Sequence, residues 1–309
     1  MKTFFIRLSS GLVVAAMAIT AMLYNQYSFF VFLSIVLLGS LYEYFNITQL
    51  KREVTTGFFQ GKWFVMVLSY LAFIKAFILA SPPSSSPIGN NLLRILFDGL
   101  MSLRDSSLTL NVTIPIFVFL LFIVELYSKS EKPFENIGWK TVAIFWIVVP
   151  VILTTNIYFQ QGGFFILAMF MSIWMYDSFA YICGSLLGKH KLFERISPKK
   201  TVEGMVGGML ITMLVYSFAN KIPQLQMFSR VEWMVLALVT MVAATFGDLV
   251  ESLLKRSLNV KDSGQIMPGH GGFLDRLDSF YVAVPFVAMT LWMFTQIRNL
   301  ILVFEYLSQ

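Results

Sequence analysis

The stretch from residue 164 to residue 187, FFILAMFMSIWMYDSFAYICGSLL, carries a single charged side chain, Asp177. A helix that crosses the hydrocarbon core of a bilayer needs about 20 mostly apolar residues, and this stretch is long enough. Over all 309 residues, 57% are hydrophobic and 13% are charged, whereas about 25% are charged in soluble domains. This composition excludes soluble, disordered, coiled-coil and disulfide-stapled folds. It predicts an all-α integral membrane protein.

Eight further apolar stretches of similar length occur along the chain. They centre on Leu12–Tyr24, Phe29–Phe45, Trp63–Ala80, Val112–Tyr127, Trp139–Tyr158, Val206–Phe218, Trp233–Phe246 and Phe280–Phe294. We therefore expect about nine transmembrane helices. The first stretch follows two basic residues, as in a signal peptide, but the spans after it favour a helix that is not cleaved.

The distribution of basic residues predicts the orientation. When the loops between the nine spans are assigned alternately to the two sides, 17 of the 23 Lys and Arg residues fall on one side and 5 on the other, with Lys75 inside a span. Basic residues are enriched in cytoplasmic loops. We therefore expect the N-terminus in the cytoplasm and the C-terminus outside, in a multi-pass protein of the cell membrane.

The sequence predicts a single polytopic membrane domain over residues 1–309, without an internal repeat. Residues 1–111 comprise the N-terminal spans and a long outer loop, Ser81–Asn111, in which Leu92–Leu103 is compatible with an amphipathic surface helix or a plain loop. Residues 112–309 contain the spans with polar motifs. A single cysteine, Cys183, permits no internal disulfide.

Polar residues gather in three stretches that the charge count places on the cytoplasmic side. The first is Asp177–Lys191, where a carboxylate in an apolar span is costly and usually faces a polar cavity. The second is Ser197–Gly204, which continues into Gly207 and Gly208, and the third is Gly247–Ser279. We expect residues 177–208 and 247–279 to form one site.

The third stretch has the spacing of a site on two helix ends. Four polar residues fall at i, i+3, i+4 and i+7 of one helix face (Asp248, Glu251, Ser252 and Lys255), and Asp275 and Asp278 are three residues apart. Carboxylates suit Mg²⁺, which prefers oxygen ligands and often shares them with phosphate. Basic side chains suited to a polyphosphate accompany them: Lys255, Arg256, Lys261 and Arg276. The pattern predicts phosphoryl or nucleotidyl transfer at the cytoplasmic surface.

Each motif taken alone also has a structural interpretation. The run Ser197-Pro198-Lys199-Lys200 is compatible with a helix cap and solvated lysines, and Gly207 and Gly208 with close helix packing. Asp275, Arg276 and Asp278 are compatible with a local ion-pair cluster. The functional interpretation is favoured because all the motifs fall on the same side of the membrane.

The run SLLKRSLNVKDSGQIMPGHGGFLDRLD, residues 252–278, resembles the signature of phosphatidate cytidylyltransferase, also called CDP-diacylglycerol synthase. The first two polar stretches are similar to that family's other cytoplasmic motifs. The chain departs from the family pattern at Phe179, Ser185 and Val202, where a glycine, a basic residue and an aromatic residue are common.

The resemblance implies a Mg²⁺-dependent reaction in which CTP and phosphatidic acid give CDP-diacylglycerol and pyrophosphate. It implies catalytic roles for Asp248, Asp275 and Lys255 and a metal site formed by Asp248, Asp275 and Asp278. The residues that it implies for substrate binding are Ser197, Lys199, Lys200, Thr201, Glu203, Arg256, Lys261, Asp262, His270, Gly271, Gly272 and Arg276. A second, monovalent ion and a homodimer stay open, and no nucleic acid partner is expected.

Two other functions stay open at this point. A CTP-dependent polyprenol or dolichol kinase has a distantly similar C-terminal region and would transfer a γ-phosphate. A transporter would use intramembrane acids such as Glu43, Glu125 and Asp177 along its pathway, but it predicts repeated, interrupted helices that the sequence does not contain.

Overall fold

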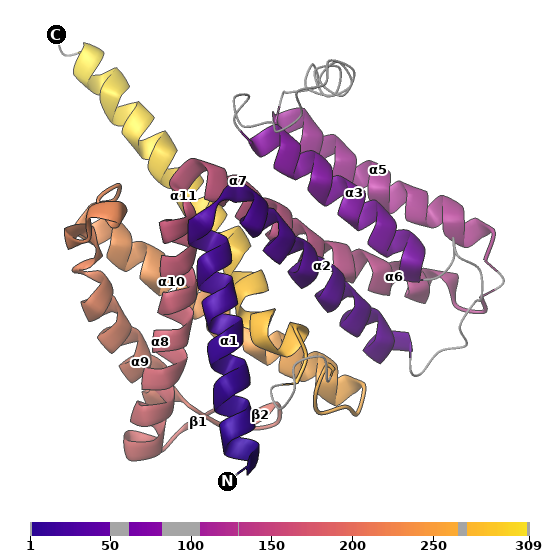
Figure 1. Cartoon of the computed structure of the whole chain (residues 1–309), viewed down its shortest axis with the longest axis horizontal. Helices are drawn as coiled ribbons and strands as arrows, with labels where there is room; N and C mark the ends of the chain where they lie inside the picture. Colours follow the sequence, from indigo (N-terminus) through magenta and orange to yellow (C-terminus); the bar gives the residue numbers. More distant parts are fainter. Residues whose placement is uncertain (1, 50–61, 82–105, 129, 265–270, 308–309) are drawn as a thin grey trace. The chain divides into compact units, whose positions relative to one another are not determined.

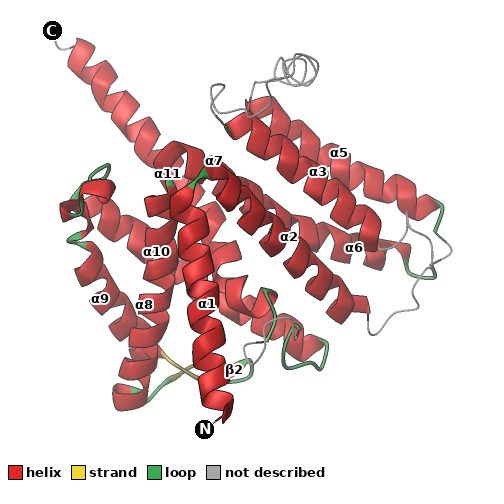
Figure 2. Cartoon of the chain, viewed as in Figure 1, coloured by secondary structure: helices red, strands yellow, loops and turns green. Residues whose placement is uncertain are grey.

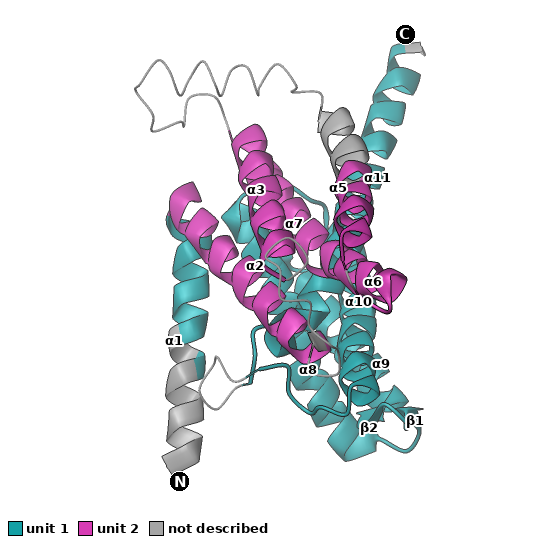
Figure 3. Ribbon diagram, turned by 90° about the vertical axis from the view of Figure 1, so that its right-hand side faces the viewer, with its two compact units in different colours: residues 1–24, 161–309 teal, residues 25–160 magenta. Residues whose placement is uncertain are grey.

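The computed structural model describes residues 2–49, 62–81, 106–128, 130–264 and 271–307, and these residues are almost entirely helical (Figure 2). The chain forms two compact units, drawn in different colours in Figure 3. One comprises residues 25–160, and the other comprises residues 1–24 and 161–309. Most of the expected outer loop, including 92–103, lies outside the described residues.

The unit of residues 25–160 is a bundle of helices (Figure 1). Its elements are α2 (Gln26–Gln49), α3 (Lys62–Ala80), α5 (Ser106–Leu126), α6 (Pro133–Ala143), a π-helical segment η2 (Ile144–Val148) and α7 (Val149–Gln161). The last three follow one another without a break and form a single span, Pro133–Gln161.

The other unit contains the polar motifs. Its elements are α1 (Lys2–Tyr24), α8 (Gly163–Leu187), the strands β1 (Lys191–Phe193) and β2 (Ser197–Thr201), α9 (Val202–Tyr216), the 3₁₀ turns η3 (Ala219–Lys221) and η4 (Pro223–Leu225), α10 (Arg230–Ser257) and α11 (Leu274–Leu307). The two strands pair antiparallel as a short hairpin between α8 and α9. In this unit α8 packs on α9, and α10 packs on α11.

Seven helices of the described chain are long and apolar enough to cross a membrane: Gln26–Thr48, Lys62–Ala80, Pro133–Gln161, Gly163–Leu187, Val202–Lys221, Arg230–Ser257 and Leu274–Tyr306. The expected all-α membrane fold is confirmed, and the chain is a multi-pass membrane protein. Two shorter apolar helices, Val14–Tyr24 and Pro115–Leu126, coincide with the first and fourth expected spans. The count of nine and the orientation stay predictions.

Small residues allow α8 and α9 to pack closely. A Cβ atom on Gly208 would lie 2.8 Å from the backbone nitrogen of Ala180, and one on Gly204 would lie 2.6 Å from the carbonyl oxygen of Ala180. On Gly207 it would lie 2.8 Å from Cys183 Sγ. Glycines four residues apart commonly let membrane helices approach in this way. The packing interpretation of Gly207 and Gly208 is therefore confirmed.

The contact between α10 and α11 depends on Gly247. A Cβ atom there would lie 2.7 Å from the carbonyl oxygen of Asp278 and 2.8 Å from Ser279 Cα. Both obstructing atoms belong to the backbone of α11, which cannot rotate out of the way as a side chain can. Only glycine allows this approach.

Local signals define both ends of α10. At its start, Ser229 Oγ accepts a hydrogen bond from Glu232 N, and the Glu232 carboxylate accepts one from Ser229 N, which is a capping box. At its end, Asn259 has a φ of 54°. The amides of Asn259 and Val260 donate to the carbonyls of Arg256 and Lys255, as in a Schellman motif. The chain therefore turns directly after the basic pair of the third motif.

A buried ion pair joins α5 to α6. Lys140 Nζ lies 2.8 Å from Glu125 Oε2, with side chains 9% and 2% exposed, and Asn136 Nδ2 donates to Glu125 Oε1. The charge count grouped Lys140 with the loop residues, although it lies at the start of the span expected over Trp139–Tyr158. The structure places it inside α6, where a buried ammonium group needs a partner, and the Glu125 carboxylate is that partner.

We predict that Lys140→Met lowers the free energy of unfolding by about 3 kcal/mol, because it leaves the Glu125 carboxylate buried without its cation. The measurement is titration of the detergent-solubilised protein with dodecyl sulfate, followed by circular dichroism. The control is Lys132→Met, whose pair with Glu135 is exposed at 3.5 Å and contributes about 0.5 kcal/mol or less. Equal effects of the two substitutions would contradict the prediction.

We predict opposite effects of the same substitution at two helical glycines. Gly247→Ala should destabilise by about 1–3 kcal/mol, because its Cβ meets backbone atoms. Gly138→Ala should be stabilising by about 0.5–1 kcal/mol, because no atom lies within 4 Å of its Cβ and alanine is the better helix former. The same unfolding titration checks both, and a Gly247→Ala protein as stable as the wild type would refute the tight contact.

Candidate active site

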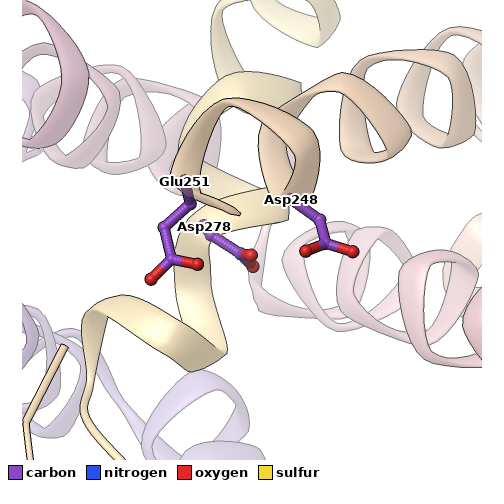
Figure 4. Close-up of side chains that lie close together, drawn as sticks. All are labelled: Asp248, Glu251 and Asp278. Carbon is purple, nitrogen blue, oxygen red and sulfur yellow. The ribbon is translucent and has the colours of Figure 1, made fainter. Parts of the chain in front are cut away.

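The contact at Gly247 brings together three carboxylates from two helices. Asp248 and Glu251 lie one turn apart on α10, and Asp278 lies in the first turns of α11. Each offers one oxygen within 4.8 Å of the others. Figure 4 shows the three carboxylates next to one another. We call Asp248, Glu251 and Asp278 the acidic cluster.

The acidic cluster fits a divalent cation. Glu251 is fully buried, and Asp278 is 7% exposed. Both carboxylate oxygens of Glu251 are buried, and the charge that faces them within α10 is the ammonium group of Lys255. Carboxylates this close repel one another unless a cation or a proton lies between them. Several oxygen ligands in one place are what Mg²⁺ prefers.

Lys255 connects this cluster to Asp275. Its ammonium group forms an ion pair with Glu251 one turn earlier on α10 and lies 2.8 Å from Asp275 Oδ1 on α11. Asp275 Oδ2 also accepts hydrogen bonds of 2.9 Å from the amides of Ser263 and Gly272. Asp275 therefore fastens the end of α10 and the loop after it to the start of α11.

The hairpin of β1 and β2 also contributes a charged side chain to the acidic cluster. Lys200, on β2, forms an ion pair with Asp248, and both side chains are about one-third exposed (28% and 33%). Ser252 Oγ donates to the other oxygen of the Asp248 carboxylate at 3.3 Å. Asp177 of α8 interacts electrostatically with both Lys200 and Asp248. The structure thus brings residues of the second and third polar motifs together, and Asp177 of the first motif lies near enough to interact with them.

Thr201 and Glu203 hold the backbone around the hairpin. Thr201 Oγ1 accepts a hydrogen bond from Gly204 N and caps α9. The Glu203 carboxylate accepts from the amides of Lys189 (3.0 Å) and His190 (3.1 Å), and it lies 2.6 Å from His190 Nδ1. These contacts fix the loop between α8 and β1.

The remaining expected residues lie on the hairpin, at the end of α10, in the loop after it and at the start of α11. The exposed ones are Lys199, Arg256, Lys261, Asp262 and Arg276. Ser197 is half-buried on β2. Gly272 donates its amide to Asp275, and Gly271 has a φ of 86°, with Asp275 Oδ2 2.8 Å from where a Cβ would lie. His270 lies outside the described residues.

Glu251 was not among the metal ligands expected from the sequence, although it was expected on the same helix face as Asp248. The signal was present, because Asp248 and Glu251 are three residues apart on one helix. The ion pair of Asp275 is formed with Lys255 of α10 and thus joins two helices; the interpretation of residues 275–278 as a local ion-pair cluster stays a prediction.

Comparison with known proteins identifies the relatives of this chain. A phosphatidate cytidylyltransferase of Bacillus subtilis is 39% identical over 183 residues, which cover 58% of this chain and 66% of that protein. One of Staphylococcus epidermidis is 48% identical over 135 residues, which cover 43% of this chain and 50% of that protein. The chain thus matches less than two thirds of the length of these curated relatives. The sequence model of the cytidylyltransferase family matches residues 5–294, and the chain therefore belongs to that family.

Proposed function

We propose that this protein is a phosphatidate cytidylyltransferase. A phosphate oxygen of phosphatidic acid attacks the α-phosphorus of CTP, the bond from that phosphorus to the bridging oxygen breaks, and pyrophosphate leaves as CDP-diacylglycerol forms. The observation that carries the proposal is the convergence of Lys200, Asp248, Lys255 and Asp278 from three separate elements. Membership of the cytidylyltransferase family supports it.

In this proposal the acidic cluster holds Mg²⁺, with Glu251 alongside Asp248 and Asp278. The bound ion offsets the negative charge of the triphosphate and of the departing pyrophosphate. Asp275 orients Lys255, because its carboxylate accepts from that ammonium group and from two backbone amides. This assignment gives Asp275 a positioning role in place of the ligand role that the resemblance implied.

The basic side chains bind the phosphates. Lys200 and Lys255 lie at the acidic cluster. The exposed Arg256, Lys261 and Arg276 lie in the last turn of α10, in the loop after it and in the first turn of α11. The lipid phosphate is already anionic near neutral pH, so the reaction requires no strong general base. Alignment of the two phosphates and stabilisation of charge then supply the catalysis.

The substrates explain why the site belongs at a membrane surface. Phosphatidic acid keeps its acyl chains in the bilayer, whereas CTP arrives from water. We place the site on the cytoplasmic face of the cell membrane, because 17 of the 23 basic residues fall on that side of the nine-span assignment.

The proposed reaction predicts where each phosphate of CTP goes. With phosphatidic acid in mixed micelles, the purified full-length protein should transfer label from α-labelled CTP to the lipid and release γ-label as pyrophosphate. The control is ATP in place of CTP, which should give little product. Transfer of γ-label to a polyprenol would show a kinase, and absence of labelled lipid in every reaction would refute the proposal.

We predict that Glu251→Gln lowers turnover by about 100-fold or more and raises the Mg²⁺ concentration for half-maximal activity, because it removes one charged oxygen ligand. The matched control is Glu194→Gln, an exposed glutamate in the turn of the hairpin, which should leave both quantities unchanged. Initial rates of pyrophosphate release at several Mg²⁺ concentrations make the comparison. Wild-type kinetics of the Glu251→Gln protein would remove Glu251 from the metal site.

A further inference from the structure

The Asp248 carboxylate is shared between two possible partners. It belongs to the acidic cluster proposed to hold a divalent cation, and it forms an ion pair with Lys200. A divalent cation and an ammonium group compete for the same negative charge, so stronger binding of one weakens the other. Binding of the cation and formation of the ion pair with Lys200 are therefore coupled through the Asp248 side chain.

Asp248 is the member of the cluster best placed for this competition. The Glu251 side chain is 1% exposed and Asp278 is 7% exposed at the contact between α10 and α11, whereas the Asp248 side chain is 33% exposed. Asp248 thus joins the buried part of the cluster to the half-exposed hairpin.

Lys200 is anchored at its backbone, so only its side chain has to move. It lies on β2 directly before Thr201, which pairs with Lys191 of β1 and caps α9. Beyond these anchors the ammonium group stands on a flexible four-carbon chain with three rotatable donors.

A second carboxylate also acts on Lys200. Asp177 of α8 attracts the Lys200 ammonium group and repels the Asp248 carboxylate. The neighbouring residue Tyr176 holds α8 against α10 through a 2.6 Å hydrogen bond to Thr245. When Asp248 binds a divalent cation, Asp177 therefore still attracts the ammonium group of Lys200.

We propose that Lys200 is a positioning residue that couples cation capture to triphosphate capture. Binding of the divalent cation at Asp248 loosens the ion pair, and the released ammonium group then binds a phosphate of the nucleotide. This inference rests on the proposed function. It adds an order of binding, in which the divalent cation binds first and frees Lys200 to bind the triphosphate.

The inference predicts two opposite changes in Lys200→Met. Mn²⁺ binding without nucleotide should tighten by about threefold, because a half-exposed competing ion pair is lost. Binding of CTP at saturating Mn²⁺ should weaken by about threefold or more, because a phosphate ligand is lost. A purely structural role of Lys200 would weaken both, and a role in phosphate binding alone would leave Mn²⁺ binding unchanged.

The measurements are the free Mn²⁺ signal in electron paramagnetic resonance and equilibrium dialysis of labelled CTP, on the full-length protein in detergent without lipid substrate. Lys191→Met removes the same charge from the same hairpin and should change neither affinity. Lys200→Arg restores the ion pair with Asp248 and should bind Mn²⁺ no more tightly than the wild type.

Failure of the inference and failure of the proposed function give different results. If the wild type binds Mn²⁺ and CTP but Lys200→Met binds Mn²⁺ no more tightly, the coupling is wrong and the proposed function stands. An equal gain in Lys191→Met would also overturn the coupling, because it would be an effect of overall charge. A wild type that binds neither Mn²⁺ nor CTP would overturn both.

Discussion

The close backbone contact between α10 and α11 at Gly247 is the constraint on which the site depends. The next residue on α10 is Asp248, and the obstructing backbone atoms on α11 belong to Asp278 and Ser279. Two carboxylates are therefore brought together by the same contact that packs the helices. Their mutual repulsion opposes this contact, and cations at the site relieve it.

The charges around this contact are paired across elements and not within one helix alone. Lys255 joins the end of α10 to Asp275 at the start of α11, and Lys200 joins the hairpin to Asp248. Burying a charge without a partner costs several kcal/mol, so the largely buried pair of Lys255 and Asp275 also specifies how α10 and α11 meet. The same groups that suit phosphate and metal chemistry thus determine the local fold.

The sequence predicted the membrane class, because the length of apolar stretches is readable without a structure. From charge asymmetry it placed the three motifs on one side of the membrane, and that orientation stays a prediction. It also placed Asp248 and Glu251 on one face of a helix from their spacing. It could not separate Asp275 from Asp278, since both lie at the start of α11 and spacing alone does not give the rotation of that helix. The structure turns Asp278 to the acidic cluster and Asp275 to Lys255. The partner of Lys140 was not predicted for a related reason, because Glu125 lies 15 residues away on another helix.

The choice of lysine over arginine at the acidic cluster has a physical consequence. In the part of the chain that the structure describes, Asp248 pairs with Lys200 and Glu251 pairs with Lys255. An arginine would hold a carboxylate through a planar, two-pronged contact that resists exchange, while an ammonium group is a compact charge on a flexible chain. In the proposed reaction, a triphosphate is bound and pyrophosphate is released in every cycle, so the ion pairs of the site would have to exchange repeatedly. Lysine pairs at Asp248 and Glu251 meet this requirement, because each carboxylate can change partner without a change in the backbone.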